Sequence, residues 1–298
     1  MSQEARASEG LPALLETLDL EEIDENIYRG QNEPGRPGRL FGGQVAAQSL
    51  VAAGRTVRGV PVHSLHGYFL RPGDPAVPVV YTVDRIRDGR SFSTRRVVAQ
   101  QRGKAIFNMA ASFHEAERGY THQLEMPDAP PPEEVASWRE HIERLTGKIP
   151  EQFREMVKRE RPVETRHVHP PTFLGGPTRE GPSQLWIRAR EHLGDDPFLH
   201  QCVLTYATDI SLVDCVLQPH GSRGELGPMM TASLDHAIWF HRPLRMDEWL
   251  LYHIDSPAAY GARGLSRGSV YTQAGVLVAS TSQEALVRPV SNAEDRSQ

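Results

Sequence analysis

The sequence predicts an α+β fold of two similar halves, each an antiparallel sheet wrapped around a central helix. Two observations carry this prediction. Landmark residues repeat in the same order along the 298-residue chain, and each half shows one apolar helix followed by several strands. The hydrophobic content of 39% and the charged content of 24% are typical of a globular protein of one or two domains.

The repeat is anchored by residues in and around the expected strands of each half. The landmarks of the first half return 171 positions later (242 − 71), so that Arg71, Tyr81 and Arg96 match Arg242, Tyr252 and Arg267. After a shift of one residue, Gly103 matches Gly275, and each opens a final apolar strand. Coincidence between apolar segments is the alternative, but four landmarks in one order favour a duplication.

Each half is expected to begin with a long apolar helix. FGGQVAAQSLVAAG at 41–54 and FLHQCVLTYATDISLVDCV at 198–216 are 157 positions apart (198 − 41). The offset is 14 shorter than that of the strands (171 − 157), which fits an extra Gly- and Pro-rich loop, QPHGSRGELGPMM, after the second helix. Both helices are apolar nearly all round, which indicates burial inside a curled sheet.

The strands follow in the same order in both halves. VPVVYTVDRI, SFSTRRVVAQ and AIFNMAASF form the first set, with a hairpin signal at Asp88-Gly89, and EWLLYHID, GLSRGSVYTQ and VLVASTSQEALV form the second. Between the halves, MPDAPPPEE reads as a linker, and VASWREHIERL and PEQFREMVKRE read as helices of a connecting arm. We therefore divide the chain into a first half (11–118), a linker with connecting helices (119–160) and a second half (161–290).

Composition and missing motifs exclude several classes of function. The net charge of −5 argues against nucleic acid as a partner, and no apolar run approaches the ~20 residues of a membrane span. The N-terminus has no secretory pattern and the C-terminus no peroxisomal Ser-Lys-Leu, so we expect the cytoplasm. The cysteines, Cys202 and Cys215, form no CxxC pair, and HExxH, GxSxG, Walker A and GxGxxG motifs are missing. We expect no metal and no cofactor.

Three polar residues of the second half stand where the first half is apolar or small. Asp209 lies in the second apolar helix, opposite the region of Ala52 in the first. Gln283 lies in the last strand, where the first half has Ala110-Ala111. Ser233, at the start of the strand after the helix, corresponds to Val62. Each could be structural on its own, since a satisfied core aspartate is common, but the three together indicate one functional site and one degenerate partner.

At this point the chain resembles a known family. FGGQ, HGYFLRPGD, DGRSFSTRRV, WFHRP, EWLLY and GVLVASTSQE, spread from Leu18 to Arg288, resemble the type II acyl-CoA thioesterases, the TesB-like double-hotdog enzymes. The resemblance implies two fused hotdog folds, hydrolysis of acyl-CoA to free fatty acid and CoA, and a homo-oligomer. It also implies a catalytic set of Asp209, Ser233 and Gln283, with serine where many bacterial members have threonine.

The chemistry suits these residue types. A thioester carbonyl is electrophilic, so water deprotonated by Asp209 as general base can attack it while Gln283 and Ser233 hold the water in line. Direct attack by Ser233 is the alternative. Gly43, at the start of the first helix, is the candidate oxyanion donor through its backbone N–H; the alternative is a glycine needed only for helix entry.

Two other functions remain to be weighed. A non-catalytic acyl-CoA-binding hotdog protein would be expected to lose the polar trio, which this chain retains. An enoyl-CoA hydratase would need an Asp/His pair, and downstream of Asp209 the next acid is Asp214, with no histidine before His220. The sequence does not define the acyl chain length, the residues that bind the CoA phosphates or the number of subunits.

Overall fold

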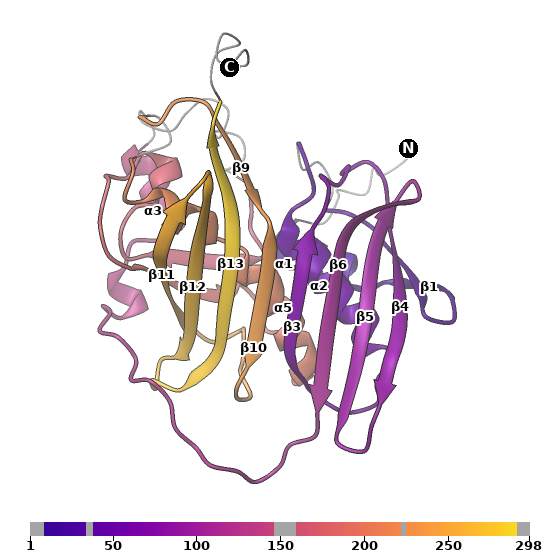
Figure 1. Cartoon of the computed structure of the whole chain (residues 1–298). Helices are drawn as coiled ribbons and strands as arrows, with labels where there is room; N and C mark the ends of the chain where they lie inside the picture. Colours follow the sequence, from indigo (N-terminus) through magenta and orange to yellow (C-terminus); the bar gives the residue numbers. More distant parts are fainter. Residues whose placement is uncertain (1–8, 34–37, 146–158, 222–224, 291–298) are drawn as a thin grey trace, which may run out of the picture.

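The computed structural model describes residues 9–33, 38–145, 159–221 and 225–290. Within these residues, thirteen strands form one continuous antiparallel sheet that curls around the central helices (Figure 1). Twelve of the strands follow the order β1-β2-β4-β5-β6-β3-β10-β13-β12-β11-β8-β7, and β9 pairs with β13 outside this path. No helix in the described ranges is long and apolar enough to cross a membrane.

In its described residues, the first half contains two helices and six strands. They are α1 (Gly10–Leu18), β1 (Glu21–Asp24), β2 (Ile27–Gly30), α2 (Gly42–Gly54), β3 (Val62–Phe69), β4 (Val79–Asp88), β5 (Phe92–Gln101) and β6 (Lys104–His114). The hairpin expected at Asp88-Gly89 is confirmed by the antiparallel pairing of β4 with β5. The sequence analysis missed α1 and the β1–β2 hairpin.

The second half repeats this plan with one additional strand, β9, and with its second helix, α6, placed after the central helix instead of before it. Its elements are β7 (Val163–His167), η3 (Thr172–Leu174), β8 (Ser183–Ala189), α5 (Pro197–Thr208), α6 (Leu212–Leu217), β9 (Met229–Ser233), β10 (Asp235–Phe240), β11 (Leu250–Tyr260), β12 (Arg263–Thr272) and β13 (Leu277–Pro289). Strands β7 and β8, which precede the central helix as β1 and β2 do, were also missed.

The strand order confirms the internal repeat. Read outward from the β3–β10 pair, the first half runs β3-β6-β5-β4-β2-β1 and the second β10-β13-β12-β11-β8-β7. The 171-residue offset holds in the register, since Tyr81 faces Ala99 while Tyr252 faces Val270. The two expected sheets are joined edge to edge, because β3 and β10 pair and leave no free edge between the halves.

The core is shared by both halves. Helix α2 is buried along most of its length and packs against strands β2–β6 on one side and against α5 on the other. Its small residues, such as Ala46, Ala47 and Ala53, are fully buried and let the two helices approach closely. Helix α6 lies on β11, β12 and β13. The arrangement brings the beginning of one central helix beside the end of the other.

The prediction of a single long helix at 198–216 is wrong. Helix α5 ends at Thr208, Asp209 is its C-cap, and Ser211 turns the chain through a left-handed conformation (φ 76°) before α6 begins. Apolar periodicity continued across this break and concealed it. Ser233 was expected to start a strand, but it is the last residue of β9.

The connecting segment runs along the outside of the second half. After β6 the chain has no regular structure until the 3-10 turn η1 (Pro132–Glu134), and α3 (Trp138–Leu145) confirms the first connecting helix. Trp186 Nε1 donates to the carbonyl of Pro130 at 2.8 Å, which fixes the linker against β8. Most of the second expected helix lies outside the described residues. The division of the chain at 118 and 160 stays a prediction.

Candidate active site

The break after α5 places a carboxylate against the start of α2. Asp209 Oδ2 accepts a hydrogen bond from the backbone N–H of Gly43 at 2.9 Å, and Asp209 Oδ1 accepts one from the hydroxyl of Ser233 at 3.0 Å. The first N–H groups of a helix have no acceptor inside the helix and carry partial positive charge. The first half of the chain therefore supplies part of the setting for an acid that belongs to the second half.

Gln283 completes the predicted trio. Its Nε2 donates to Ser233 Oγ at 2.9 Å, and its side chain is completely buried. The proximity follows from the sheet, because β9 pairs with β13 and places Ser233 opposite Ala285, two residues from Gln283. The structure thus brings Asp209, Ser233 and Gln283 together, while their catalytic roles stay predictions.

The sequence analysis missed a fourth polar residue, His236 of β10. Its Nδ1 lies 2.7 Å from Gln283 Oε1, and its Nε2 lies 3.0 Å from the hydroxyl of Thr208. The signal that could have revealed it is the same comparison of halves: 171 positions earlier stands Leu65, so His236 is another polar residue at an apolar position of the first half.

Burial dominates the electrostatics of the site. It raises the pKa of Asp209 above the ordinary value of an aspartate, against the opposing effects of His236 and of the hydrogen bonds from Ser233 and Gly43. It also lowers the pKa of His236, against the opposing charge of Asp209. An ionised carboxylate with a raised pKa is a stronger base than an ordinary aspartate, which suits it to accept a proton.

Two glycines are required where α2 meets Asp209. A Cβ at Gly42 would lie 2.7 Å from Asp209 Oδ2, and a Cβ at Gly43 would lie 2.4 Å from the carbonyl oxygen of Tyr206. The close approach of the two helices therefore accounts for the glycine pair. The N–H of Gly43, expected to be an oxyanion donor, donates to Asp209 in this structure, so its role toward an oxyanion stays a prediction.

The corresponding region of the first half is apolar. In the register of the sheet, His236 corresponds to Leu65 and Gln283 to Ala111. His236 and Gln283 lie on the neighbouring strands β10 and β13, and Leu65 faces Ala111 across β3 and β6. Leu65 and Ala111 are both buried. Helix α2 of this half carries buried amides, and Gln48 Oε1 accepts from the hydroxyl of Tyr81 at 2.6 Å. No acid of the first half stands in the position of Asp209 among the described residues.

The other buried acid near the break has a structural role. Asp214 accepts hydrogen bonds from the backbone N–H groups of Thr172 and Phe173, at 3.1 and 3.2 Å, and from the hydroxyl of Thr172. These bonds hold η3 against α6. Asp214 is therefore a satisfied core aspartate.

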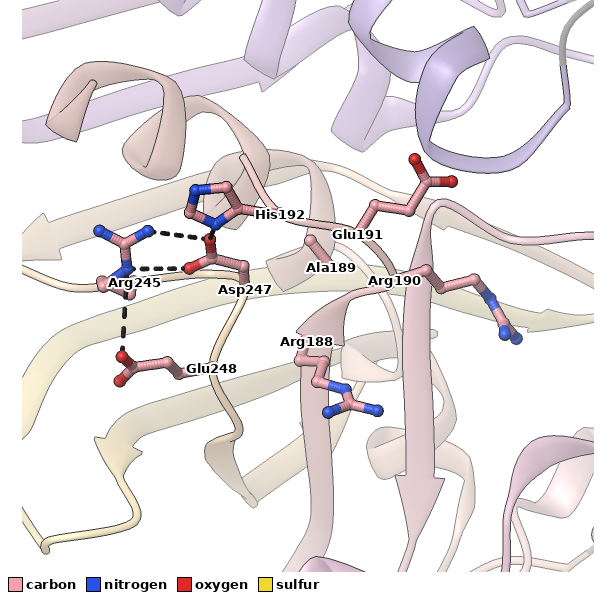
Figure 2. Close-up of a pocket in the computed structure, with 8 residues that line it drawn as sticks. All are labelled: Arg188, Ala189, Arg190, Glu191, His192, Arg245, Asp247 and Glu248. Atoms are coloured by element: carbon pink, nitrogen blue, oxygen red, sulfur yellow. Dashed lines mark hydrogen bonds and ion pairs between the residues drawn. The ribbon is translucent and has the colours of Figure 1, made fainter. Parts of the chain in front are cut away.

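A separate pocket of about 430 Å³ lies beside the other end of α5 (Figure 2). Arg245 pairs with Asp247 and Asp195, each at 2.9 Å, and His192 Nδ1 lies 2.7 Å from Asp247. The 12 residues of α5 rise by roughly 18 Å, which separates this pocket from Asp209. The ion pairs satisfy one another, so the pocket resembles a structural network more than an anion site.

Two exposed arginines of β12, a residue type suited to bind phosphates, are paired with acids. Arg263 lies 3.0 Å from Glu284, and Arg267 lies 2.7 Å from Asp255. Arg267 and its first-half match Arg96, which pairs with Asp84 at 2.5 Å, form equivalent cross-strand bridges. Both landmarks of the repeat are therefore explained by the sheet.

Neither cysteine is exposed. Cys202 and Cys215 are free and buried, and burial raises the pKa of the Cys215 thiol to about 12. They pack as small apolar residues. In the part of the chain that the structure describes, no group of three His, Cys, Asp or Glu side chains is arranged to hold a metal ion.

Comparison with known proteins gives a consistent result in both halves. The family model "Acyl-CoA thioesterase" matches residues 153–286, and the model "Acyl-CoA thioesterase N-terminal domain" matches residues 32–114. Acyl-coenzyme A thioesterase 8 of Mus musculus is 42% identical over 281 residues, which cover 91% of this chain and 87% of that protein.

Solved structures agree with the fold. The acyl-CoA thioesterase II TesB2 from Mycobacterium marinum is 45% identical with a TM-score of 0.76, and the match covers 93% of this chain and 99% of that one. A protein with a hotdog fold from Alicyclobacillus acidocaldarius, 18% identical, has a TM-score of 0.72 over 94% of this chain and 99% of its own. The expected double-hotdog architecture is confirmed.

Proposed function

The chain belongs to the acyl-CoA thioesterase family and hydrolyses acyl-CoA thioesters, and we propose that it does so with a water molecule that Asp209 deprotonates. The single observation that carries the proposal is the contact of the buried Asp209 carboxylate with both Ser233 and Gly43. The family resemblance and the comparison of the halves single out the same acid. Catalysis then takes place at one site, in the second half.

Asp209 acts as the general base. Its two oxygens offer about four lone-pair directions, and the interactions with Ser233, Gly43 and Gln283 use at most three of them. One direction remains for the proton of a water. Asp209 is a buried residue, so the carboxylate is enclosed by protein. General-base catalysis of this kind contributes about 10²–10⁴-fold.

Ser233 and Gln283 orient the water and the carboxylate. The hydroxyl proton of Ser233 points to Asp209, and the amide of Gln283 donates to Ser233. Fixed hydrogen-bond directions keep the base within reach of the attacking water, and misplacement by an ångström can lower a rate about 100-fold. A threonine at 233 would preserve the hydroxyl and its bonds.

The start of α2 supplies positive potential for the oxyanion. Gly43 N–H donates to Asp209 before reaction. When Asp209 accepts the proton of the water, its negative charge disappears as charge develops on the thioester oxygen. The Gly43 N–H then loses Asp209 as a charged acceptor at the moment the oxyanion forms. A hydrogen bond from this N–H to the oxyanion would stabilise the tetrahedral intermediate.

Direct attack by Ser233 is the second mechanism. The 3.0 Å bond to Asp209 gives this hydroxyl a base, which is the arrangement of an activated nucleophile. We favour water because Ser233 Oγ also accepts from Gln283, a donor that lowers its nucleophilicity.

Rapid mixing with palmitoyl-CoA, with acid quench and mass spectrometry of the protein, tests the choice between the two mechanisms. Water activation predicts CoA release without a burst and no acyl group on the protein. A burst together with an acylated Ser233 would overturn it. A protein that binds palmitoyl-CoA but releases no thiol would instead be the acyl-CoA-binding protein weighed above.

The enoyl-CoA hydratase alternative is not favoured. His236 is the only histidine that the site brings near Asp209 among the described residues, and both of its ring nitrogens are engaged, by Gln283 and by Thr208. Neither is free to exchange a proton with a substrate.

We propose that the protein is located in the cytoplasm and forms a homo-oligomer. The free, buried cysteines are consistent with a reducing compartment, and the family resemblance favours association of subunits. Fractionation of cells and light scattering of the purified protein test the two statements, and a monomer at micromolar concentration would contradict the second.

A further inference from the structure

His236 stands behind the trio without touching Asp209. Its ring bridges Gln283 Oε1, 2.7 Å from Nδ1, and the Thr208 hydroxyl, 3.0 Å from Nε2. The side chains of His236, Gln283 and Thr208 are all essentially buried. A buried polar group that lacks its partner is costly, so each of these bonds constrains the orientation of the next group.

The directions of these bonds follow from the orientation of the Gln283 amide. Burial lowers the pKa of His236, so the ring is neutral and carries one N–H. The amide oxygen of Gln283 can only accept, which places that hydrogen on Nδ1. Nε2 is then the acceptor for the hydroxyl of Thr208, which has the carbonyl of Thr205, 3.2 Å away, as its other acceptor.

We propose that His236 is a positioning residue that holds the Gln283 amide in the orientation that directs the proton of Ser233 to Asp209. With the amide oxygen facing His236, its NH₂ group faces Ser233, and the serine hydroxyl is left to donate to Asp209. With the amide reversed, its oxygen would face Ser233 and draw the proton away from Asp209. The inference rests on the proposed function and extends it to a residue outside the reacting groups.

The surroundings hold the histidine in place. The Thr208 carbonyl accepts from the hydroxyl of Tyr252 at 3.1 Å, and that hydroxyl also lies 2.8 Å from Thr281 Oγ1. In the first half, which lacks the trio, the matching tyrosine Tyr81 is present, but the position of the histidine is taken by Leu65. The fold therefore accepts leucine at this point, and the histidine accompanies the functional half alone.

Two substitutions at 236 separate positioning from packing. His236→Leu removes both bonds with a side chain that the first half already uses at this position. His236→Asn keeps an N–H donor close to the position of Nδ1. We expect kcat of His236→Leu to fall about 10- to 100-fold with KM nearly unchanged, and kcat of His236→Asn to stay within about threefold of wild type.

The matched control is His63→Leu. His63 lies on β3, the first-half counterpart of β10, with its Nε2 2.8 Å from Ser112 Oγ, and its loss should leave kcat unchanged. If His236→Leu fails to fold, Thr208→Val and Thr208→Ser replace it, because only the serine keeps the donor to Nε2. Wild-type kcat in His236→Leu or in Thr208→Val, or equal losses in the Leu and Asn variants, would overturn the inference.

Asp209→Asn in the same assay separates this inference from the proposed function. If Asp209→Asn is inactive while His236→Leu is normal, only the positioning role fails. If Asp209→Asn turns over like wild type, the water-activation mechanism itself fails.

Discussion

Replacing Gly42 with alanine should damage catalysis while sparing the fold. Gly42 is the first residue of α2 and does not have a positive φ, so alanine is acceptable to the backbone and favoured over glycine in a helix by about 0.5–1 kcal/mol. The added Cβ, however, would lie 2.7 Å from Asp209 Oδ2 and 2.7 Å from Phe69 Cζ. The ring of Phe69 can turn, but the carboxylate is held by two hydrogen bonds.

The size of the effect follows from this distance. To restore ordinary contact at 3.4 Å, Asp209 Oδ2 must move by about 0.7 Å. Catalytic groups have to be held to within about 0.5 Å, and a displacement of 1 Å can lower a rate about 100-fold. We therefore expect kcat of Gly42→Ala to fall about 10- to 100-fold, with a melting temperature close to that of wild type.

The assay is release of free thiol from palmitoyl-CoA, with thermal unfolding measured on the same samples. Gly119→Ala is the matched control, because a Cβ there meets nothing within 4 Å. It should leave both kcat and the melting temperature unchanged. A wild-type kcat in Gly42→Ala would refute the reasoning that the position of the carboxylate limits the rate.

The remaining predictions concern the acid and its serine. Activity should be lost on acidification at a higher pH than the ordinary pKa of an aspartate, because burial raises the pKa of Asp209; a kcat–pH profile checks this, and a limb at the ordinary value would contradict it. Ser233→Thr should retain nearly full kcat, whereas Ser233→Ala should lower it about 10-fold or more and move the acidic limb to higher pH, since the bond that lowers the pKa of Asp209 is lost. Asp209→Asn should stabilise the protein at pH 8, because it removes a buried negative charge. The pKa of Asp209 is raised in the folded state, so the stability that this carboxyl contributes is complete below its unfolded pKa of about 3.9 and is lost as the pH rises through the folded pKa. Urea unfolding at pH 8 and below pH 4 checks this, and an equal gain at both pH values would oppose it.

Much of the fold could be predicted because duplication left a readable register. The offset that joins Tyr81 to Tyr252 holds through the strand pairs, and the same offset joins Arg96 to Arg267. The break between α5 and α6 could not be predicted, because the apolar pattern continues through Asp209 and the left-handed turn at Ser211 has no glycine to mark it. The edge strand β7 buries alternate residues, but two of the three, Thr165 and His167, are polar, so its sequence shows little apolar alternation.

Comparison of the two halves predicts which polar residues lie together in the second half, while their catalytic roles stay predictions. It singled out Asp209, Ser233 and Gln283, and it would have singled out His236 had position 65 been compared as well. The contact of Gly43 with Asp209 could not be read from the sequence, because it joins residues 166 positions apart through the packing of two helices. Only the folded chain shows that one half of the protein supplies the N–H groups and the other the acid.

The most direct test of the role of Asp209 is the rate of thioester hydrolysis by the Asp209→Asn variant under single-turnover conditions with palmitoyl-CoA. Asparagine preserves the shape of the side chain and an acceptor for Gly43 N–H but cannot take a proton from water. The account predicts a rate about 10²–10⁴-fold below wild type with substrate binding retained. A rate within a few fold of wild type would show that another group activates the water.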